Sequence, residues 1–342
     1  MAISRRWTLR RYVENDSKPQ VDDFVLGEVE VGKPCAGELL VRAIYLSMDP
    51  YMRGRISPAR NYTEGVRPGD LMTGRAVAEV LESQADGFRP GNIVIGETGW
   101  QEYRVVKASS MRKVDPSLAP ISTAVGLLGM PGLSAYFALL DLGRPRPGDT
   151  VLITAASGAV GSAAGQIARL SGCRTIGLVG SAAKARYCVQ ELGYDVAIDY
   201  RASSDLSGEV AHAAPSGVDV FFDNSGGTVH QAVIPHLAVG ARVVICGVMS
   251  QYNPIESSRP SPYNMRHLLV PRAIVSGFLI YDFAHRTNEG LARLSAWYRN
   301  GNLKFRETVA QGLEQAPAAF ISMLTGDNLG KQLVQVGPDP TR

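Results

Sequence analysis

Short hydrophobic runs separated by turn-forming residues fill the chain from Trp7 to about Lys113. Runs of strand-forming residues that are bounded by Gly, Pro and Asp predict β-strands. The runs that fit this pattern are FVLGEVEV, ELLVRAIYL, LMTGRAVAEVL and NIVIGETGWQEYRVV. The first part of the chain is therefore predicted to be a β-rich, barrel-like domain.

The pattern changes at Thr150, where strand-like runs begin to alternate with helix-like runs. TVLIT is followed by the helical pattern VGSAAGQIARLSG, and RTIGLVG by the helical pattern AAKARYCVQELG; VDVFFDNSGG and ARVVICGVM come later. This alternation is typical of parallel βαβ units. Between the two regions, ISTAVGLLGMPGLSAYFALLDLG is predicted to be helical and could belong to either. The sequence thus predicts an α/β protein.

Length and composition narrow the class of protein. With 342 residues, the chain is long enough for two domains. Its net charge of +3 is spread without a Lys/Arg block, which argues against a nucleic-acid partner. No apolar run reaches the roughly 18 residues of a membrane span, and the amino terminus lacks the apolar core of a signal peptide. Four scattered cysteines without a C-x-x-C pair suit a reducing compartment, so we expect a soluble, cytoplasmic protein.

A glycine-containing turn after TVLIT is the first candidate site. Residues 154–162, TAASGAVGS, contain an A-x-G-x-x-G form of the dinucleotide fingerprint. Small residues let the backbone approach a pyrophosphate, and the following helix offers free N–H groups and the positive end of its dipole. The alternative is a tight strand-to-helix turn that binds nothing. The strand before it, the helix after it and the continuing βαβ pattern favour the dinucleotide site.

The second strand of this region indicates which dinucleotide is used. An NAD site would carry Asp or Glu at the end of that strand, whereas RTIGLV ends in Gly180-Ser181. Lys184 lies in the predicted first turn of the next helix, where a cation could hold a 2′-phosphate. The alternative is that Lys184 is a solvated surface residue. The missing carboxylate and the nearby cation together predict NADPH rather than NADH.

Residues that could hold a catalytic metal are scarce. Between Met1 and Lys113 there is no histidine and Cys35 is the only cysteine, so that region cannot assemble a Cys/His zinc site. The five histidines fall in the second half, without metal-ligand spacing, and each is interpreted as a surface or core residue: His212, His230, His236, His267 and His285. A G-x-S-x-G elbow is also missing from the sequence, which argues against a hydrolase.

Hydride chemistry without a metal is simplest on a conjugated system, because an enone or enal accepts hydride at carbon and spreads charge onto its carbonyl oxygen. A hydrogen-bond donor at that oxygen would help. A tyrosine, with an ordinary pKa of about 10, is neutral at pH 7 and suits the role.

Several stretches resemble the zinc-independent branch of the medium-chain dehydrogenase/reductase family, which includes prostaglandin reductases, plant alkenal double-bond reductases and bacterial curcumin reductase. The motifs lie nearly end to end along the chain: LSMDPYMRGR from Leu46, GMPGLSAYFAL from Gly129, AASGAVGSAAGQIA, GVDVFFDNSGG, CGVMSQYN and GDNLGK from Gly326. The resemblance implies a Rossmann domain, residues 128–303, inserted in a β-rich GroES-like catalytic domain formed by residues 1–127 and 304–342. It also implies a homodimer.

The resemblance further implies site residues and an activity. Tyr252 would lie near the substrate carbonyl and Tyr51 would line the pocket, so these are the candidate catalytic residues. The expected reaction is NADPH-dependent reduction of the C=C bond of α,β-unsaturated ketones or aldehydes, without a metal. The implied cofactor-binding residues are Met130, Pro131, Gly158, Ala159, Val160, Gly161, Lys184, Tyr200, Asn224, Cys246, Gly247, Val248, Met249, Ser250, Tyr252, Phe278, Leu279, Ile280 and Asn328.

Alternatives stay open at this point. Asn224 and Asn328 could be turn formers, and Tyr51 and Tyr252 could be packing residues. The reaction could be quinone reduction, or the chain could bind NADP without catalysis. The segment NPIESSRPSPYNMRHLL is predicted to be a long loop that sets substrate preference.

Overall fold

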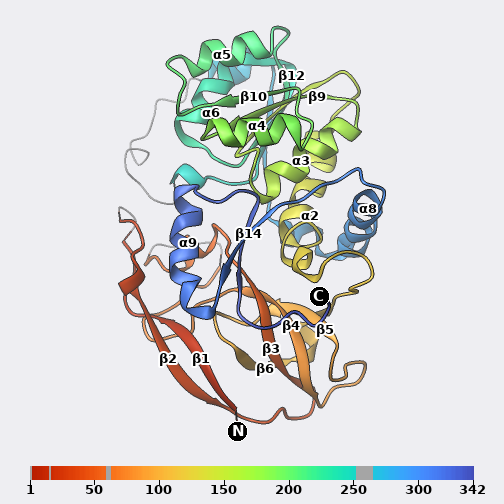
Figure 1. The fold of residues 1–342 in the computed structure, drawn as a ribbon. Coiled ribbons are helices and arrows are strands. Elements are labelled where there is room, and N and C mark those ends of the chain that lie inside the picture. Colours follow the sequence, from red (N-terminus) through yellow and green to blue (C-terminus); the bar gives the residue numbers. More distant parts are fainter. Residues whose placement is uncertain (1, 15–16, 59–62, 252–264) are drawn as a thin grey trace. The chain divides into compact units, whose positions relative to one another are not determined.

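The computed structural model describes residues 2–14, 17–58, 63–251 and 265–342. They fold into two compact units (Figure 1). Unit 1 consists of Met1–Gly126 together with Glu307–Arg342, and unit 2 consists of Leu127–Arg306. The chain therefore leaves unit 1, builds unit 2 and then returns to unit 1.

A six-stranded parallel sheet forms the centre of unit 2, with strand order β10-β9-β8-β11-β12-β13. The chain builds outward from β8 to β10 and then restarts at β11, beside β8. Open α/β sheets bind ligands at such a reversal, outside the carboxyl ends of the strands. The strands are β8 (Thr150–Thr154), β9 (Arg174–Val179), β10 (Val196–Asp199), β11 (Val218–Asp223), β12 (Leu237–Ile245) and β13 (Ile274–Gly277).

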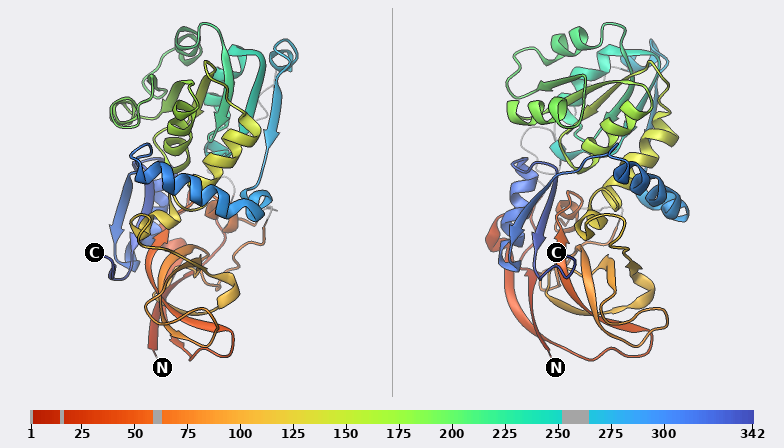
Figure 2. Two further views of the ribbon diagram at one scale, coloured as in Figure 1. Left: turned by 90° about the vertical axis from the view of Figure 1, so that its right-hand side faces the viewer. Right: turned by 45° about the vertical axis from the view of Figure 1, so that its right-hand side comes forward.

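Helices cover both faces of this sheet, as Figure 2 shows. The central strands are nearly continuous hydrophobic runs because parallel strands are buried on both faces. On one face, side chains such as Leu152, Ile176 and Phe221 pack with Val210 and Val233 of two helices. The helices of unit 2 are α2 (Met130–Phe137), α3 (Ala159–Leu170), α4 (Ala182–Gln190), α5 (Leu206–Ala213), α6 (Gly227–Val233), α7 (Arg266–Leu269) and α8 (Thr287–Arg299).

Unit 1 is built mainly from antiparallel strands. Its larger sheet has the order β14-β15-β3-β4-β5-β7, with β6 paired to β3, and β1 pairs with β2 separately. The strand β15 brings the end of the chain beside β3. One of its hydrophobic cores is built around Trp100, Phe24 and Phe320. The elements are β1 (Ala2–Leu9), β2 (Phe24–Val31), β3 (Glu38–Ser47), α1 (Met52–Arg55), β4 (Arg75–Ser83), β5 (Ile93–Glu97), β6 (Tyr103–Lys107), β7 (Arg112–Lys113), β14 (Glu307–Gln311), α9 (Ala316–Thr325) and β15 (Lys331–Gln335).

The predicted α/β class, with a parallel Rossmann-like sheet and a β-rich remainder, is confirmed. Two local predictions differ. The stretch from Ile121 to Gly143 is not one helix but a 3-10 turn, the helix α2 and a wider π-helical turn over Ala138–Gly143. Most of the predicted long loop lies outside the described residues, and its last part is helical, forming α7. None of the helices in the described ranges is long and apolar enough to cross a bilayer.

Candidate functional site

The carboxyl ends of the six parallel strands collect most of the sequence-predicted residues of unit 2. Because neighbouring strands run in the same direction, their ends lie at one edge of the sheet. Ala155–Gly158 follows β8, Gly180 follows β9 and Tyr200 follows β10. Asn224 follows β11, residues 246–250 follow β12, and residues 278–280 follow β13.

The turn after β8 presents a helix N-terminus. Ala155 adopts a left-handed φ of 49°, which bends the chain sharply from strand to helix. Gly158 is the N-cap residue of α3, and no side chain in the described ranges caps that end. The first N–H groups of a helix have no partner within it, so those after Gly158 can bind an anion, helped by the helix dipole.

The two glycines of this turn, Gly158 and Gly161, differ in how much room the surrounding chain leaves for a side chain. A Cβ on Gly161 would lie 2.3 Å from the carbonyl oxygen of Ala155, so only glycine fits there. A Cβ on Gly158 would meet only that same oxygen, at 3.2 Å, and its φ of −78° suits any residue. Packing within the chain therefore explains Gly161, whereas close approach of a ligand would explain Gly158.

The end of β10 brings the Tyr200 hydroxyl and the Arg201 guanidinium near Gly180, and Lys184 follows β9 in the first turn of α4. The Ser181 hydroxyl accepts a hydrogen bond from the Lys184 backbone at 3.3 Å and so caps α4. A Cβ on Gly180 would lie 3.1 Å from the Tyr200 hydroxyl and 3.2 Å from Nε of Arg201. Glycine thus leaves room at the end of β9, where Tyr200 and Arg201 approach from the adjacent strand β10.

Arg201 was not among the predicted residues. Its guanidinium carbon lies 5.9 Å from the centre of the Tyr200 ring, and its backbone N–H donates to the Asp199 carboxylate at 3.1 Å. The signal that could have found it is the cation directly after Tyr200, at the end of the strand that pairs with β9.

The ends of β8, β11 and β12 are joined by hydrogen bonds. The Asn224 side chain donates to the Thr154 carbonyl at 2.8 Å, so it joins two strand ends and is more than a local turn former. The loop after β12 binds the turn after β11: Met249 N–H donates to the Asn224 carbonyl at 3.3 Å, and the Ser250 hydroxyl to the Ser225 carbonyl at 2.7 Å. The predicted residues of these two segments are therefore neighbours.

The remaining predicted residues of unit 2 lie on α2 and after β13. Met130 and Pro131 are the first two residues of α2. Gly132 is essential to that start, because a Cβ there would lie 1.8 Å from the carbonyl oxygen of Leu127. The Phe278 ring contacts Phe283, whose ring in turn stacks on Phe137 of α2 with centroids 4.9 Å apart.

Unit 1 holds the other two predicted residues, Tyr51 and Asn328. Tyr51 precedes α1 and is half-buried, and its pKa is raised well above the ordinary value by burial and by Asp49. Asn328 donates through its amide to the Gly330 carbonyl at 2.8 Å. Lys331 binds Asp49 at 3.1 Å in a buried ion pair, which ties GDNLGK to MDPY within the unit.

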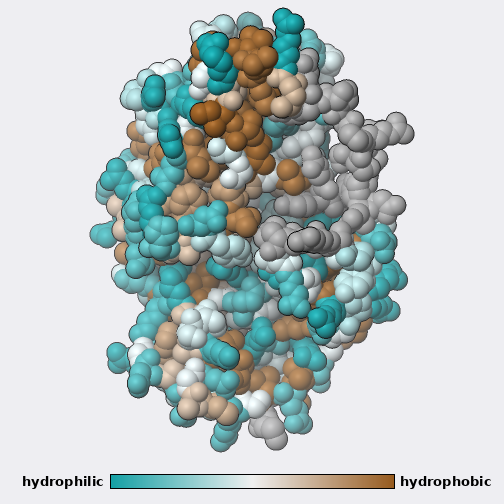
Figure 3. Space-filling view, turned by 180° about the vertical axis from the view of Figure 1, so that it is seen from behind, coloured by the Kyte–Doolittle hydropathy of each residue, from teal (hydrophilic) through white to brown (hydrophobic). Residues whose placement is uncertain are grey.

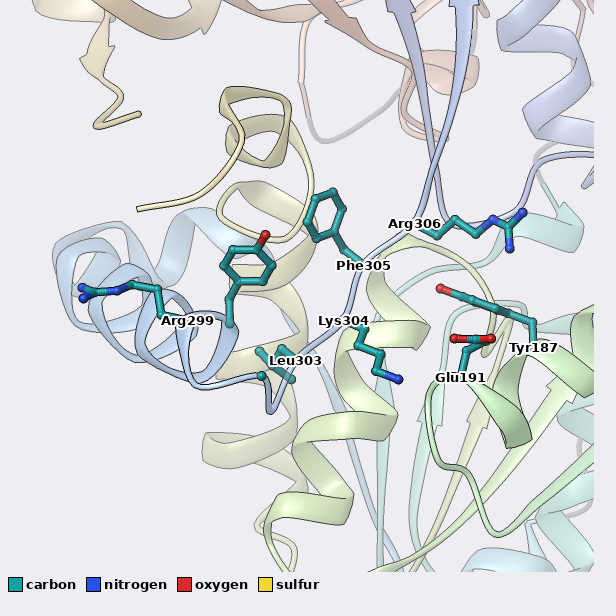
Figure 4. Close-up of a pocket in the computed structure, with 9 residues that line it drawn as sticks. Tyr187, Glu191, Arg299, Leu303, Lys304, Phe305 and Arg306 are labelled. Carbon is teal, nitrogen blue, oxygen red and sulfur yellow. The ribbon is translucent and has the colours of Figure 1, made fainter. Parts of the chain in front are cut away.

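Three further observations concern the extent of the site. Tyr252, the other candidate catalytic residue, lies outside the described residues. In the part of the chain that the structure describes, no group of three or more His, Cys, Asp or Glu side chains is placed to hold a metal. A pocket of about 700 Å³ between α4 and residues 298–306 of unit 2, drawn in Figure 4, has none of the predicted site residues in its lining.

Comparisons with known proteins agree with this arrangement. Residues 5–114 match the family described as N-terminal domain of oxidoreductase, and residues 159–296 match the one described as zinc-binding dehydrogenase. The NADPH-dependent curcumin reductase of Escherichia coli is 38% identical, with 98% of each chain covered. The NADP-dependent 2-alkenal reductase of Nicotiana tabacum is 37% identical, with 88% of each covered.

A solved structure is equally similar. The crystal structure of CurA in complex with NADPH from Vibrio vulnificus has a TM-score of 0.91 and 39% identity, covering 98% of this chain and 100% of the other. Matches of this identity over nearly the whole length establish the family. The chain belongs to the zinc-independent branch of the medium-chain dehydrogenase/reductase family of oxidoreductases.

Proposed function

We propose that this protein is an NADPH-dependent reductase of carbon–carbon double bonds conjugated to a carbonyl, acting on enals and enones. The observation that carries the proposal is the set of strand ends in unit 2, where the N-terminus of α3, which no side chain of the described residues caps, and the Arg201 guanidinium lie along one edge of the sheet, with Lys184 in the first turn of α4. Relatives named for curcumin and 2-alkenal reduction support this class of substrate.

The residues at this edge fit NADPH. The N–H groups after Gly158 would bind the pyrophosphate, and Lys184 with Arg201 and Tyr200 would bind the 2′-phosphate. Residues 246–250 and the start of α2 would border the nicotinamide. When bound, NADPH supplies the hydride that the alkene carbon accepts.

Tyrosine hydroxyls would support the carbonyl oxygen of the substrate as negative charge develops there. Tyr51 suits this role, because a tyrosine is already protonated at neutral pH and the upward shift of its pKa by burial leaves it so. We assign the same role to Tyr252. In this scheme the reaction requires no metal.

The test is NADPH oxidation, with NADH in parallel, against a panel of enals, enones and quinones. We expect turnover of enones with NADPH preferred, unaffected by a chelator, and a saturated carbonyl product identified by NMR. Turnover of quinones alone would replace the proposed reaction by quinone reduction. NADPH binding with no turnover of any compound would make the protein a non-catalytic binder.

We also propose that a second copy of the chain covers the edge of the parallel sheet. β13 is the edge strand, and Ile274 and Val275 on it are 63% and 44% exposed. Val239, Leu269 and Val270 nearby in unit 2 are exposed too. Figure 3 shows hydrophobic side chains gathered on the face of unit 2 seen from behind. A hydrophobic edge of this kind pairs readily with another chain.

Light scattering of the wild type should give twice the mass of one chain. The Ile274→Lys variant should give the mass of a single chain. Val189→Lys is the control, because Val189 is equally apolar and 42% exposed but lies on α4. A monomeric wild type would exclude the proposed dimer.

A further inference from the structure

A buried carboxylate lies at the centre of the strand ends described above. Asp223, the last residue of β11, is completely buried. Its side chain accepts hydrogen bonds from the Thr154 hydroxyl at 2.8 Å, from Ser225 N–H at 2.9 Å and from Gly226 N–H at 3.1 Å. The fourth donor is the His230 ring, whose Nδ1 lies 2.7 Å from the carboxylate. The carboxylate therefore joins the end of β8 to the turn after β11.

The backbone of the same residue holds a third strand end. The Asp223 carbonyl accepts from Cys246 N–H at 2.8 Å and from Gly247 N–H at 3.1 Å. The loop after β12 thus depends on Asp223 as well. One residue thus connects the end of β8, just before the pyrophosphate turn, with the loop after β12, which the proposed function places beside the nicotinamide.

The proton positions follow from the chemistry of the donors. Burial acts to raise the pKa of Asp223, but the hydrogen bonds from His230, Ser225, Gly226 and Thr154 outweigh it and leave the pKa below its ordinary value. The side chain is then an ionised carboxylate, which can only accept hydrogen bonds. Nδ1 of His230 is therefore the hydrogen-bond donor, and the Asp223 carboxylate is the acceptor.

His230 is placed to act on the site indirectly, through Asp223. It lies on α6, its ring is 5.3 Å from that of Phe221 on β11, and 12% of its side chain is exposed. Its ring bonds Asp223, and Asp223 in turn bonds the loop after β12, which would contact the cofactor. The sequence interpretation of each histidine as a surface or core residue missed this pairing with Asp223.

We propose that His230 is a positioning residue, which orients Asp223 and through it the strand-end segments that hold the nicotinamide half of the cofactor. This inference rests on the proposed function for the identity of the cofactor. It concerns only the nicotinamide half, because Lys184 follows β9, and Tyr200 and Arg201 follow β10, whereas Asp223 ends β11.

The test compares two substitutions at one position. His230→Leu removes the donor, whereas His230→Asn keeps an N–H close to the place of Nδ1. The ligands are NADPH and adenosine 2′,5′-bisphosphate, which carries the phosphate end without the nicotinamide. His212→Leu is the control, because His212 is exposed on α5.

We expect His230→Leu to weaken NADPH binding about tenfold or more, as for the loss of a hydrogen bond to a charged group, and to lower kcat. Affinity for the bisphosphate should stay within about twofold, and His230→Asn should recover most of the NADPH affinity. Wild-type NADPH affinity in His230→Leu would overturn the proposal. An equal loss of affinity for NADPH and for the bisphosphate would also overturn it. The same holds if His230→Asn loses as much NADPH affinity as His230→Leu.

The design separates this proposal from the proposed function. Binding is measured without a substrate, so a wild type that binds NADPH but reduces no enone would refute the reaction and leave the binding comparison decisive. If His230→Leu does not fold, the comparison of His230→Asn with the wild type takes its place, and an NADPH affinity lowered tenfold in that folded variant would count against the proposal.

Discussion

At the residue scale, the packing role of Gly161 and the proposed ligand-binding role of Gly158 can be distinguished by experiment. Gly161→Ala should destabilise the protein by about 1–3 kcal/mol, because its Cβ would overlap the Ala155 carbonyl at 2.3 Å. Gly158→Ala should change the free energy of unfolding by less than about 1 kcal/mol, since its backbone suits alanine. Its NADPH affinity should nevertheless fall about tenfold or more, because the methyl group would crowd the pyrophosphate. Thermal melting and NADPH titration of both variants check this, and unchanged affinity in Gly158→Ala would contradict the assigned phosphate site.

Lys184 and Arg201 set the expected cofactor preference. Removing either cation should raise the KM for NADPH about 10- to 100-fold. The KM for NADH should stay nearly unchanged, because NADH carries no 2′-phosphate for these cations to bind. Arg186→Ala is the matched control, since Arg186 is exposed on the same helix. Steady-state kinetics with both cofactors measure the effect. Equal losses with NADPH and NADH would show that these side chains support the fold rather than the phosphate.

At the element scale, α3 is tied to the segment by which the chain leaves unit 2. The Gln166 amide donates to the Lys304 carbonyl at 2.9 Å and accepts from Lys304 N–H at 2.8 Å. Gln166→Leu would leave both backbone groups without these partners, so we expect it to cost about 2 kcal/mol of stability. Gln166→Glu keeps the acceptor and should cost less. Hydrogen exchange should accelerate at residues 300–306 in Gln166→Leu; protection there equal to the wild type would refute the role of this contact.

The elements of unit 2 could be predicted because each carries its own signal. The strands β8, β9 and β11 are hydrophobic runs that end in turn formers, and helical patterns lie between them. The pairing of strand ends was predictable as well, since parallel order places them at one edge. The hydrogen bond between Asp223 and His230 was not, because each residue alone is compatible with a turn or a surface helix.

At the scale of the whole molecule, contacts between distant parts of the sequence were the least predictable. Lys331 and Asp49 form a buried ion pair although 282 residues separate them. The motifs GDNLGK and MDPY were both noted in the sequence, but only the pairing of β15 with β3 brings them together. No local pattern encodes that pairing. Tyr252 falls outside the described residues, so its role remains a proposal drawn from the resemblance.

The cysteines can report on the packing of unit 2, which holds three of them, with the one in unit 1 as an exposed reference. Cys35 is exposed, whereas burial raises the pKa of Cys173 to about 11 and the pKa of Cys188 and of Cys246 to about 12. Only the thiolate reacts with iodoacetamide, and a thiol whose pKa is about 12 is ionised in roughly one molecule in ten thousand at pH 8. Native protein at pH 8 should therefore be alkylated at Cys35 alone, and urea-unfolded protein at all four, as peptide mass spectrometry can establish. Rapid labelling of Cys246, which is partly exposed, would show that its thiol is not held in the surroundings that raise its pKa, and would weaken the case that Asp223 holds the loop after β12 in place.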